Sequence, residues 1–310
     1  MEQITNSILM IRPAVFRSNE ETAINNYFQH DSDLTTDQVI AQAQAEFDDF
    51  VQALRLEGVQ VIVVEDDPAL DTPDSIFPNN WISFHSDGRI ALYPMFAENR
   101  RRERREEVLL AVEEAGFEIR EIMDYTLAEQ ENLFLEGTGS MILDRVNHTA
   151  YCALSPRADE DLFLEFCEDF DQYPVVFNAY QTVEGQRAAV YHTNVILCIG
   201  EAFAVVCLSC VDHPGERQKL LSQLTADGKE IIDISEVQMH QFAGNMLQVK
   251  GKDQEPLIVM SQSAKESLTT SQKTQLQKHG RLLAVALPTI ENCGGGSARC
   301  MMAEIFLPKT

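Results

Sequence analysis

The stretch "EAFAVVCLSCVDHPGERQKLLSQLTADGKEIIDIS", residues 201–235, contains most of one structural unit. It begins with an apolar segment typical of a strand, breaks at polar residues, continues with a helical pattern and closes with a second apolar segment. Pro214 suits the first turn of that helix, because the N–H that proline lacks would have no helical partner there. The stretch therefore predicts a strand, a helix and a strand in succession.

The same plan, with one more strand in front, recurs along the chain. The other copies contain the helices predicted for residues 43–58, 99–116, 161–170 and 269–280. The segment "CMMAEIFLP", residues 300–308, resembles the second strand of a unit whose helix is the N-terminal one. Five strand-strand-helix-strand units, spaced by roughly 50 to 60 residues, predict an α/β propeller with five blades around a central site. Because no Gly/Ser linker interrupts residues 1–310, we expect a single domain.

Composition narrows the class of partner. The 310 residues carry a formal net charge of -25, which disfavours nucleic acid and anionic membrane surfaces and favours basic or zwitterionic small molecules. The same charge is also explained by solubility alone. The N-terminal stretch "MEQITNSILMIRPAVF" lacks the pattern of a signal peptide, and no segment is apolar for long enough to span a bilayer. We therefore expect a cytoplasmic protein.

The cysteines indicate reduced thiols. Their number, seven, is odd and no secretory signal precedes them, so a disulfide framework is not expected. The single C-x-x-C, "CLSC" at residues 207–210, lies in an apolar segment without a second cysteine pair or a histidine at zinc spacing. Buried strand cysteines explain it better than a metal site, and we expect neither a metal nor a cofactor.

The segment "ENCGGGSARC", residues 291–300, contains the candidate nucleophile. Cys300 follows a glycine-rich loop, so it is either a small core residue after a turn or a reactive thiol. A cysteine nucleophile needs a base, usually histidine, and often a carboxylate that orients the base. His192 opens an apolar strand and Glu136 closes an apolar run, so both could face a pocket, although on position alone a structural role explains His192 better.

Two further polar stretches are candidates. "PDSIFPNNW", residues 73–81, places Asp74, Asn79 and Asn80 between a turn and a strand. "NRRRERREE", residues 99–107, is a basic cluster in an acidic chain. It forms either a solvated helix face or a helix start from which one arginine holds a carboxylate.

Taken together, "PDSIFPNN", "LEGTG", "HTN" and "GGGSARC" resemble the guanidino-group-modifying superfamily of arginine deiminases, dimethylarginine hydrolases and amidinotransferases. These motifs occur in the family's order, and the resemblance covers nearly the whole chain. It implies the pentein fold, a five-bladed α/β propeller, and it is closest to arginine-deiminase-related citrulline-utilisation hydrolases.

The resemblance implies a role for each matching residue. Cys300 matches the nucleophile, His192 the general acid/base and Glu136 the carboxylate that orients the histidine. Asp74 matches an aspartate that helps to hold the substrate.

Two arginines match the family's pair that binds the substrate's α-carboxylate. Arg100, with Arg102 as the alternative, follows the "FPNN" motif, and Arg157 follows Glu136. Each lies about twenty residues after its motif, as the resemblance implies.

Three asparagines depart from the members that bind a cationic guanidinium, which usually carry carboxylates at these positions. They are Asn79 and Asn80 at the end of the turn and Asn194 two residues after His192. An amide offers a donor and an acceptor to a neutral ureido group, against which an unpaired buried carboxylate would be costly. The exchange favours citrulline over arginine, although Asn79 and Asn80 are also ordinary turn residues.

The sequence therefore predicts a cofactor-free cysteine hydrolase that converts citrulline to ornithine, ammonia and carbon dioxide through a covalent thio-intermediate. Hydrolysis of arginine or dimethylarginine to citrulline is the alternative, and a non-catalytic pentein that serves as a binding scaffold is the third hypothesis. The expected partner is a small amino-acid substrate, and the resemblance is compatible with a homo-oligomer.

Overall fold

The computed structural model of the chain describes residues 2–30 and 32–310 and has a mixed α/β fold. Its described residues form five three-stranded sheets and one two-stranded hairpin. In every three-stranded sheet the middle strand pairs antiparallel with one neighbour and parallel with the other. The parallel pair is joined through a helix, as parallel strands require. The predicted strand-strand-helix-strand order is thus present in each sheet.

The elements of the five sheets follow the chain. The first sheet comprises β17 (Ala303–Glu304), β1 (Ser7–Arg12) and β2 (Gln60–Glu65), with α1 (Thr36–Leu56). The second comprises β3 (Ile82–Phe84), β4 (Arg89–Leu92) and β5 (Glu121–Asp124), with α2 (Glu106–Glu114). The third comprises β6 (Met141–Asp144), β7 (Thr149–Leu154) and β8 (Tyr173–Asn178), with α4 (Glu160–Asp169). The fourth comprises β11 (Leu197–Ile199), β12 (Phe203–Val206) and β13 (Glu230–Asp233), with α5 (Pro214–Ala226). The fifth comprises β14 (Leu247–Lys250), β15 (Pro256–Ser261) and β16 (Arg281–Val285), with α7 (Gln262–Ser267) and α8 (Thr270–Gln277).

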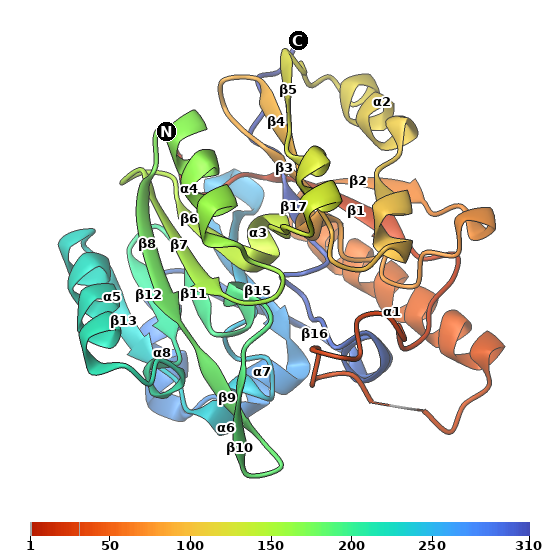
Figure 1. Cartoon of the computed structure of the whole chain (residues 1–310). Coiled ribbons are helices and arrows are strands. Elements are labelled where there is room, and N and C mark those ends of the chain that lie inside the picture. The colour runs from red at the N-terminus through yellow and green to blue at the C-terminus, as the bar shows by residue number, and fades with distance from the viewer. Residues whose placement is uncertain (1, 31) are drawn as a thin grey trace.

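The first sheet joins segments from opposite ends of the sequence. Ile8 pairs with Glu304 and Leu9 with Ala303, so β17 completes the sheet that β1 and β2 begin. Figure 1 shows β17 beside β1 in the middle of the molecule, while α1, α2 and α5 lie at its periphery. The first and last segments thus share one sheet, but the place predicted for residues 300–308 is wrong: β1 takes the middle place of the second strand, and β17 pairs at its edge as the first strand of the unit.

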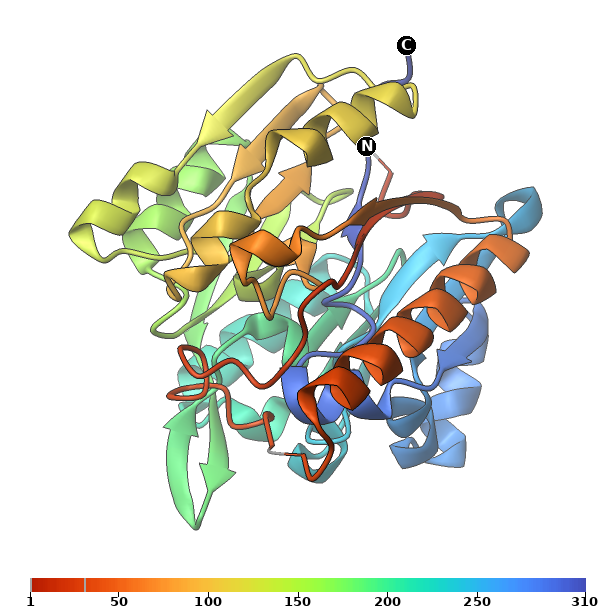
Figure 2. The same ribbon diagram turned by 90° about the vertical axis from the view of Figure 1, so that its right-hand side faces the viewer.

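Helix α1 begins earlier than the pattern at residues 43–58 predicts. Thr35 forms a capping box with Gln38, which satisfies N–H groups of the first turn and extends the helix towards its N-terminus. Phe47, Phe50 and Leu54 lie on its buried face. Figure 2 shows α1 running along the outside of the molecule.

The continuous helix predicted for residues 99–116 is wrong. The structure has a 3₁₀ helix, η3 (Asn99–Glu103), and then α2. Arg104 and Arg105 between them have non-helical backbone angles. Arg104 instead donates to Glu129 (2.6 Å) and to the carbonyl oxygen of Tyr93 (3.0 Å), and these tertiary bonds offset the loss of two helical residues.

The strand predicted through "CLSC" also ends early. Strand β12 stops at Val206, and the 3₁₀ helix η6 (Leu208–Cys210) follows it. All seven cysteines lie in the described part of the chain, where they are buried and form no disulfide.

Short turns before the strands β3, β6, β11 and β17 carry the candidate site residues other than Arg100, which lies in η3, and Arg157, which follows β7. They include the 3₁₀ helices η2 (Pro78–Asn80) and η5 (Thr193–Val195) and the single-turn helix α3 (Gly137–Ser140). Helix α3 contacts both η2 and η5. The repeat therefore brings residues that are far apart in sequence to one region.

One hairpin of the described residues lies outside the five three-stranded sheets. The hairpin β9 (Tyr180–Val183) and β10 (Gln186–Ala189) projects from the body of the molecule in both views, and α6 (Glu236–Met239) lies near its base (Figures 1 and 2). No helix in residues 2–30 and 32–310 combines the length and hydropathy needed to cross a bilayer.

Candidate active site

The glycine-rich loop before Cys300 packs against an aromatic ring. A Cβ atom built at Gly294 would lie 2.9 Å from the Phe77 ring, and one at Gly296 would lie 2.7 Å from it. Gly295 has a φ of 62°, in the left-handed region that side chains rarely adopt. The glycines thus allow the loop to approach Phe77, which directly precedes η2, and this contact brings the segment of Cys300 beside that of Asn79 and Asn80.

The Cys300 sulfur is held by two side-chain amides. Nδ2 of Asn245 lies 3.2 Å from Sγ, and Nδ2 of Asn194 lies 3.4 Å from it. All three residues are buried. Asn194 is a predicted site residue, whereas the sequence reasoning missed Asn245.

His192 and Glu136 form a buried pair. Nε2 of His192 lies 2.8 Å from Oε2 of Glu136, and the other carboxylate oxygen accepts from the backbone N–H of Phe96 (3.0 Å). A Cβ atom at Gly139 would lie 2.9 Å from the His192 ring, so glycine is needed where α3 passes the imidazole. His192 directly precedes η5, and Asn194 in that turn contacts Cys300.

The surroundings of the pair set its charge state. Burial alone would raise the pKa of Glu136, but Arg157, His192 and Arg100 outweigh burial and lower that pKa to about 2. Burial dominates at His192 and lowers its pKa to about 4, although Glu136 opposes the change. Near neutral pH the pair is therefore a carboxylate and a neutral imidazole, and the imidazole can accept a proton.

Asp74 is buried in the segment that precedes η2. Its Oδ2 accepts from Nδ2 of Asn19 (2.7 Å), while Oδ1 has no hydrogen-bond partner among the described residues. Burial raises the pKa of Asp74, and the nearby Arg100 opposes this. A buried carboxylate oxygen without a partner is available to a ligand.

Asn79 and Asn80 both lie in η2 and are buried. Nδ2 of Asn80 donates to Oδ1 of Asn79 (3.1 Å), and Oδ1 of Asn80 accepts from Arg100 (2.8 Å). Within residues 2–30 and 32–310, Nδ2 of Asn79 and Oδ1 of Asn194 have no partner. The amide nitrogen of Asn79 and the amide oxygen of Asn194 are therefore available to a ligand as a donor and an acceptor.

Arg100 points inward, as one interpretation of the basic cluster predicts. Its guanidinium makes a bidentate ion pair with Glu103 (2.9 and 3.0 Å). It also donates to Asn80 and to the carbonyl oxygens of Asp74 (3.3 Å) and Phe77 (3.2 Å). With Nη1 3.8 Å from Glu136, protein groups surround the whole guanidinium. The alternative residue, Arg102, donates to the backbone oxygens of Asn99 and Asp71 and is exposed.

Arg157 is also buried, but a different segment contacts it. Its guanidinium donates to Oδ1 of Asn25 and to the carbonyl oxygen of Thr22 (3.1 Å). Nη1 lies 3.5 Å from Glu136, and the guanidinium carbon lies 4.9 Å from the centre of the Tyr191 ring. Arg157 and Arg100 thus reach the same carboxylate, which places both near His192.

The segment between β1 and α1 adds residues that the sequence reasoning missed. Asn19 contacts Asp74, and Asn25 contacts Arg157. Asn26 donates to the carbonyl oxygen of Gly294 (3.2 Å), which ties the segment to the glycine-rich loop. Only the wealth of asparagine in "NEETAINNY" distinguishes this segment in the sequence. No periodicity indicates where such an irregular segment packs.

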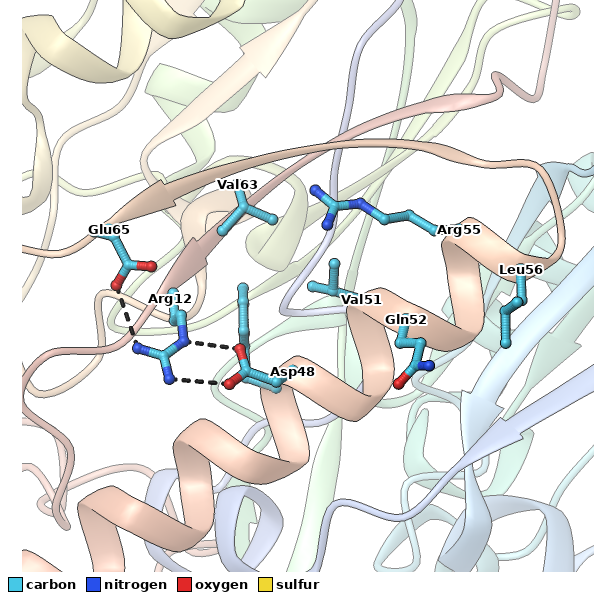
Figure 3. A pocket seen from close by; sticks show the side chains of 9 residues that line it. Arg12, Asp48, Val51, Gln52, Arg55, Leu56, Val63 and Glu65 are labelled. Atoms are coloured by element: carbon cyan, nitrogen blue, oxygen red, sulfur yellow. Dashed lines mark hydrogen bonds and ion pairs between the residues drawn. The ribbon is translucent and has the colours of Figure 1, made fainter.

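A surface groove of about 510 Å³ lies elsewhere, over α1, β1 and β2 (Figure 3). Arg12 spans it with a bidentate bond to Asp48 (2.8 and 2.9 Å) and a contact of 3.4 Å with Glu65. None of its lining residues is a predicted site residue, and its lining includes neither cysteine nor histidine. The groove is therefore not the candidate site.

Known proteins resemble the chain over almost its entire length. Residues 12–307 match the family described as "N,N dimethylarginine dimethylhydrolase, eukaryotic". No curated protein matches the chain.

Solved structures share its fold. ArgZ, an arginine dihydrolase from the ornithine-ammonia cycle in cyanobacteria, superposes with a TM-score of 0.73 at 18% identity over 98% of this chain. The match covers 41% of ArgZ, so the chain spans about two fifths of that protein. The N-terminal domain of ArgZ, solved with substrate bound, has a TM-score of 0.70 at 18% identity and is covered to 99%. A dimethylarginine dimethylaminohydrolase has a TM-score of 0.62 at 14% identity, with 97% of this chain and 100% of the other covered.

Proposed function

The chain belongs to the N,N dimethylarginine dimethylhydrolase family, and we propose that it is a hydrolase that cleaves the ureido C–N bond of citrulline. The products are ornithine, ammonia and carbon dioxide. The carrying observation is the environment of the Cys300 sulfur, whose hydrogen-bond partners among the described residues are the neutral amides of Asn194 and Asn245. A neutral ureido group fits amides, whereas a guanidinium would gain from carboxylates at this position.

In the proposed reaction the Cys300 thiol transfers its proton to neutral His192, and the thiolate attacks the ureido carbon. The imidazolium, stabilised by Glu136 at 2.8 Å, returns the proton to the departing nitrogen of ornithine. A carbamoyl-thioester remains on Cys300. Water activated by His192 then releases carbamate, which decomposes to ammonia and carbon dioxide.

The unused polar atoms support the placing of the substrate. Nδ2 of Asn79 can donate to the ureido oxygen, and Oδ1 of Asn194 and Oδ1 of Asp74 can accept from the substrate's N–H groups. Arg157 is the proposed anchor of the α-carboxylate, since its partners Asn25 and Thr22 belong to an irregular segment. Arg100 is surrounded by protein groups and would instead hold Asn80 in place. The sequence assigned both arginines to the α-carboxylate of the substrate, and the proposal keeps only Arg157 in that role.

The five sheets support a pentein propeller around this site. Strand β6 contacts β11, β11 contacts β14, and β17 contacts β3. We include in the proposal one domain over residues 2–310, a cytoplasmic location and a small amino acid as the partner.

A second candidate substrate is arginine or a methylated arginine. It is favoured by the free carboxylate oxygen of Asp74, which suits a guanidinium, and by the net charge of -25. Several proteins of similar fold are named arginine dihydrolases or dimethylarginine hydrolases.

Product analysis separates these candidates. The purified protein is incubated with citrulline, arginine and dimethylarginine, and ornithine, citrulline and ammonia are measured, with Cys300→Ser as the control. Ornithine from citrulline supports the proposal, and citrulline from arginine or dimethylarginine supports the second candidate. No turnover of any of the three would contradict both and favour a binding scaffold.

A further inference from the structure

Asn245 lies in a turn that is built to meet the nucleophile. The turn follows α6 and precedes β14, and Phe242 in it has a left-handed φ of 60°. A Cβ atom at Gly244 would lie 2.3 Å from the carbonyl oxygen of Val195. Only glycine therefore lets this turn contact the η5 turn, and that contact brings Asn245 beside Asn194 and Cys300.

Two backbone partners fix the orientation of the Asn245 amide. Oδ1 accepts from the N–H of Arg299 (3.0 Å), and Nδ2 donates to the carbonyl oxygen of Asn194 (3.1 Å). A backbone N–H can only donate and a carbonyl can only accept, so a flipped amide would lose both bonds. The second hydrogen of Nδ2 is thus committed to the Cys300 sulfur, 3.2 Å away.

The side-chain amide of Asn194 is held less firmly than that of Asn245. Its Nδ2 lies 3.4 Å from the same sulfur, but its Oδ1 has no hydrogen-bond partner among the described residues. The side chain of Asn194 can therefore turn towards a substrate, whereas that of Asn245 is held by the protein.

We propose that Asn245 is a catalytic residue whose fixed N–H group stabilises the Cys300 thiolate, and this role rests on the proposed function of Cys300 as nucleophile. A thiolate is a charged and hence stronger hydrogen-bond acceptor than a thiol, so a committed donor favours the ionised form. Asn245 also bonds Arg299, the residue next to Cys300, and fixes the sulfur relative to η5.

The test measures alkylation of Cys300 in the full chain, independently of turnover. The rate of reaction with iodoacetamide is followed from pH 5 to 10 by mass spectrometry of the peptide that contains Cys300. Because the thiolate is the reacting form, the profile reports the ionised fraction. The variants are Asn245→Asp and Asn245→Ala, with Asn194→Ala as the matched control.

We expect the midpoint of the Asn245→Ala profile to rise by about one pH unit, which lowers the rate at pH 7 about tenfold and leaves the plateau at high pH unchanged. Asn245→Asp, which places a carboxylate beside the sulfur, should shift the midpoint further. Asn194→Ala should shift it by less than half as much.

An unchanged midpoint in a folded Asn245→Ala variant, even with reduced turnover, would overturn the proposal and leave Asn245 with a structural role only. Near-ultraviolet circular dichroism establishes that each variant is folded, and Asn245→Ser replaces any variant that is not. A shifted midpoint in a protein that hydrolyses none of the three substrates would support the role of Asn245 and contradict the proposed function, so the two failures are distinguishable.

Discussion

Two histidines, His192 and His85, are both buried in this molecule, and their surroundings differ. His192 is paired with the carboxylate of Glu136 at 2.8 Å. Nε2 of His85 lies 2.8 Å from the Ser83 hydroxyl, and its ring is stacked on Phe170 with the centroids 4.0 Å apart. Burial lowers the pKa of both, and at His85 the positive charges of Arg145 and Arg89 lower it further.

The carboxylate of Glu136 therefore distinguishes His192, a candidate for proton transfer, from His85, a core histidine. Two arginines lie near each imidazole, but a proton taken up by His192 is stabilised by Glu136, whereas one on His85 has no carboxylate partner among the described residues. Burial alone does not distinguish the two, since His192 and His85 are 2% and 7% exposed.

Replacing each histidine in turn gives the largest expected contrast. His192→Asn should lower kcat about 10³-fold, because it removes the proposed acid and base of both steps. His85→Asn should leave kcat within about threefold, since its partners Ser83 and Phe170 are not candidate site residues. Steady-state kinetics on the substrate found by product analysis measure both, and similar losses in the two variants would remove the distinction.

A second experiment neutralises Glu136, the carboxylate partner of His192. Glu136→Gln leaves Arg157 and Arg100 buried without the charge between them, so we expect the free energy of unfolding to fall by about 3 kcal/mol. The control is Asp48→Asn, whose ion pair with Arg12 lies at the surface and should contribute less than about 1 kcal/mol. Urea denaturation at pH 7.5 measures both, and equal losses would mean that Glu136 is no more than another ion-pair partner.

The pH dependence of stability should reveal the core histidine. The pKa of His85 is lowered in the folded state, so below pH 6.5 the unfolded chain takes up a proton that the folded chain refuses. The free energy of unfolding then decreases on acidification by up to about 1.4 kcal/mol per pH unit relative to His85→Asn. Urea denaturation of both proteins from pH 7.5 to 5 isolates this term, because the carboxylates titrate in both. Parallel curves would show that His85 is protonated in the folded protein.

The smallest expected effect concerns the hydroxyl beside His85. Ser83 Oγ lies 2.8 Å from Nε2 of His85 and 2.6 Å from the Tyr93 hydroxyl. Ser83→Ala should lower the free energy of unfolding by about 1 kcal/mol and leave turnover unchanged. A loss of turnover in Ser83→Ala would mean that Ser83 and His85 influence the candidate site, which would contradict the assignment of His85 as a core histidine.

The fold could be predicted because its signal repeats. The order of strand, strand, helix and strand appears in every unit, so errors at individual boundaries do not change the result. The helix predicted through Arg104 failed because its bond to Glu129 lies outside any local pattern. Periodicity reports which face is buried and cannot report tertiary partners.

The same repeat explains what could be predicted of the site. Asn80, Asn194 and Cys300 each stand just before the first strand of a unit, and Asn245 occupies the equivalent place in "AGNMLQV". Comparing equivalent places across the units would therefore have found Asn245. Asn19 and Asn25 could not be found in this way, because their segment belongs to no repeat and its position depends on side-chain bonds to Asp74 and Arg157.

The pairing of β17 with β1 has a consequence for biosynthesis. Cys300 precedes β17, whose strand partner was made almost 300 residues earlier at Ile8 and Leu9. A ribosome-bound chain must therefore emerge beyond Glu304 before the sheet beside Cys300 can close. Until then β1 lacks its antiparallel neighbour, so under the proposed function a chain that ends before β17 would hydrolyse no substrate.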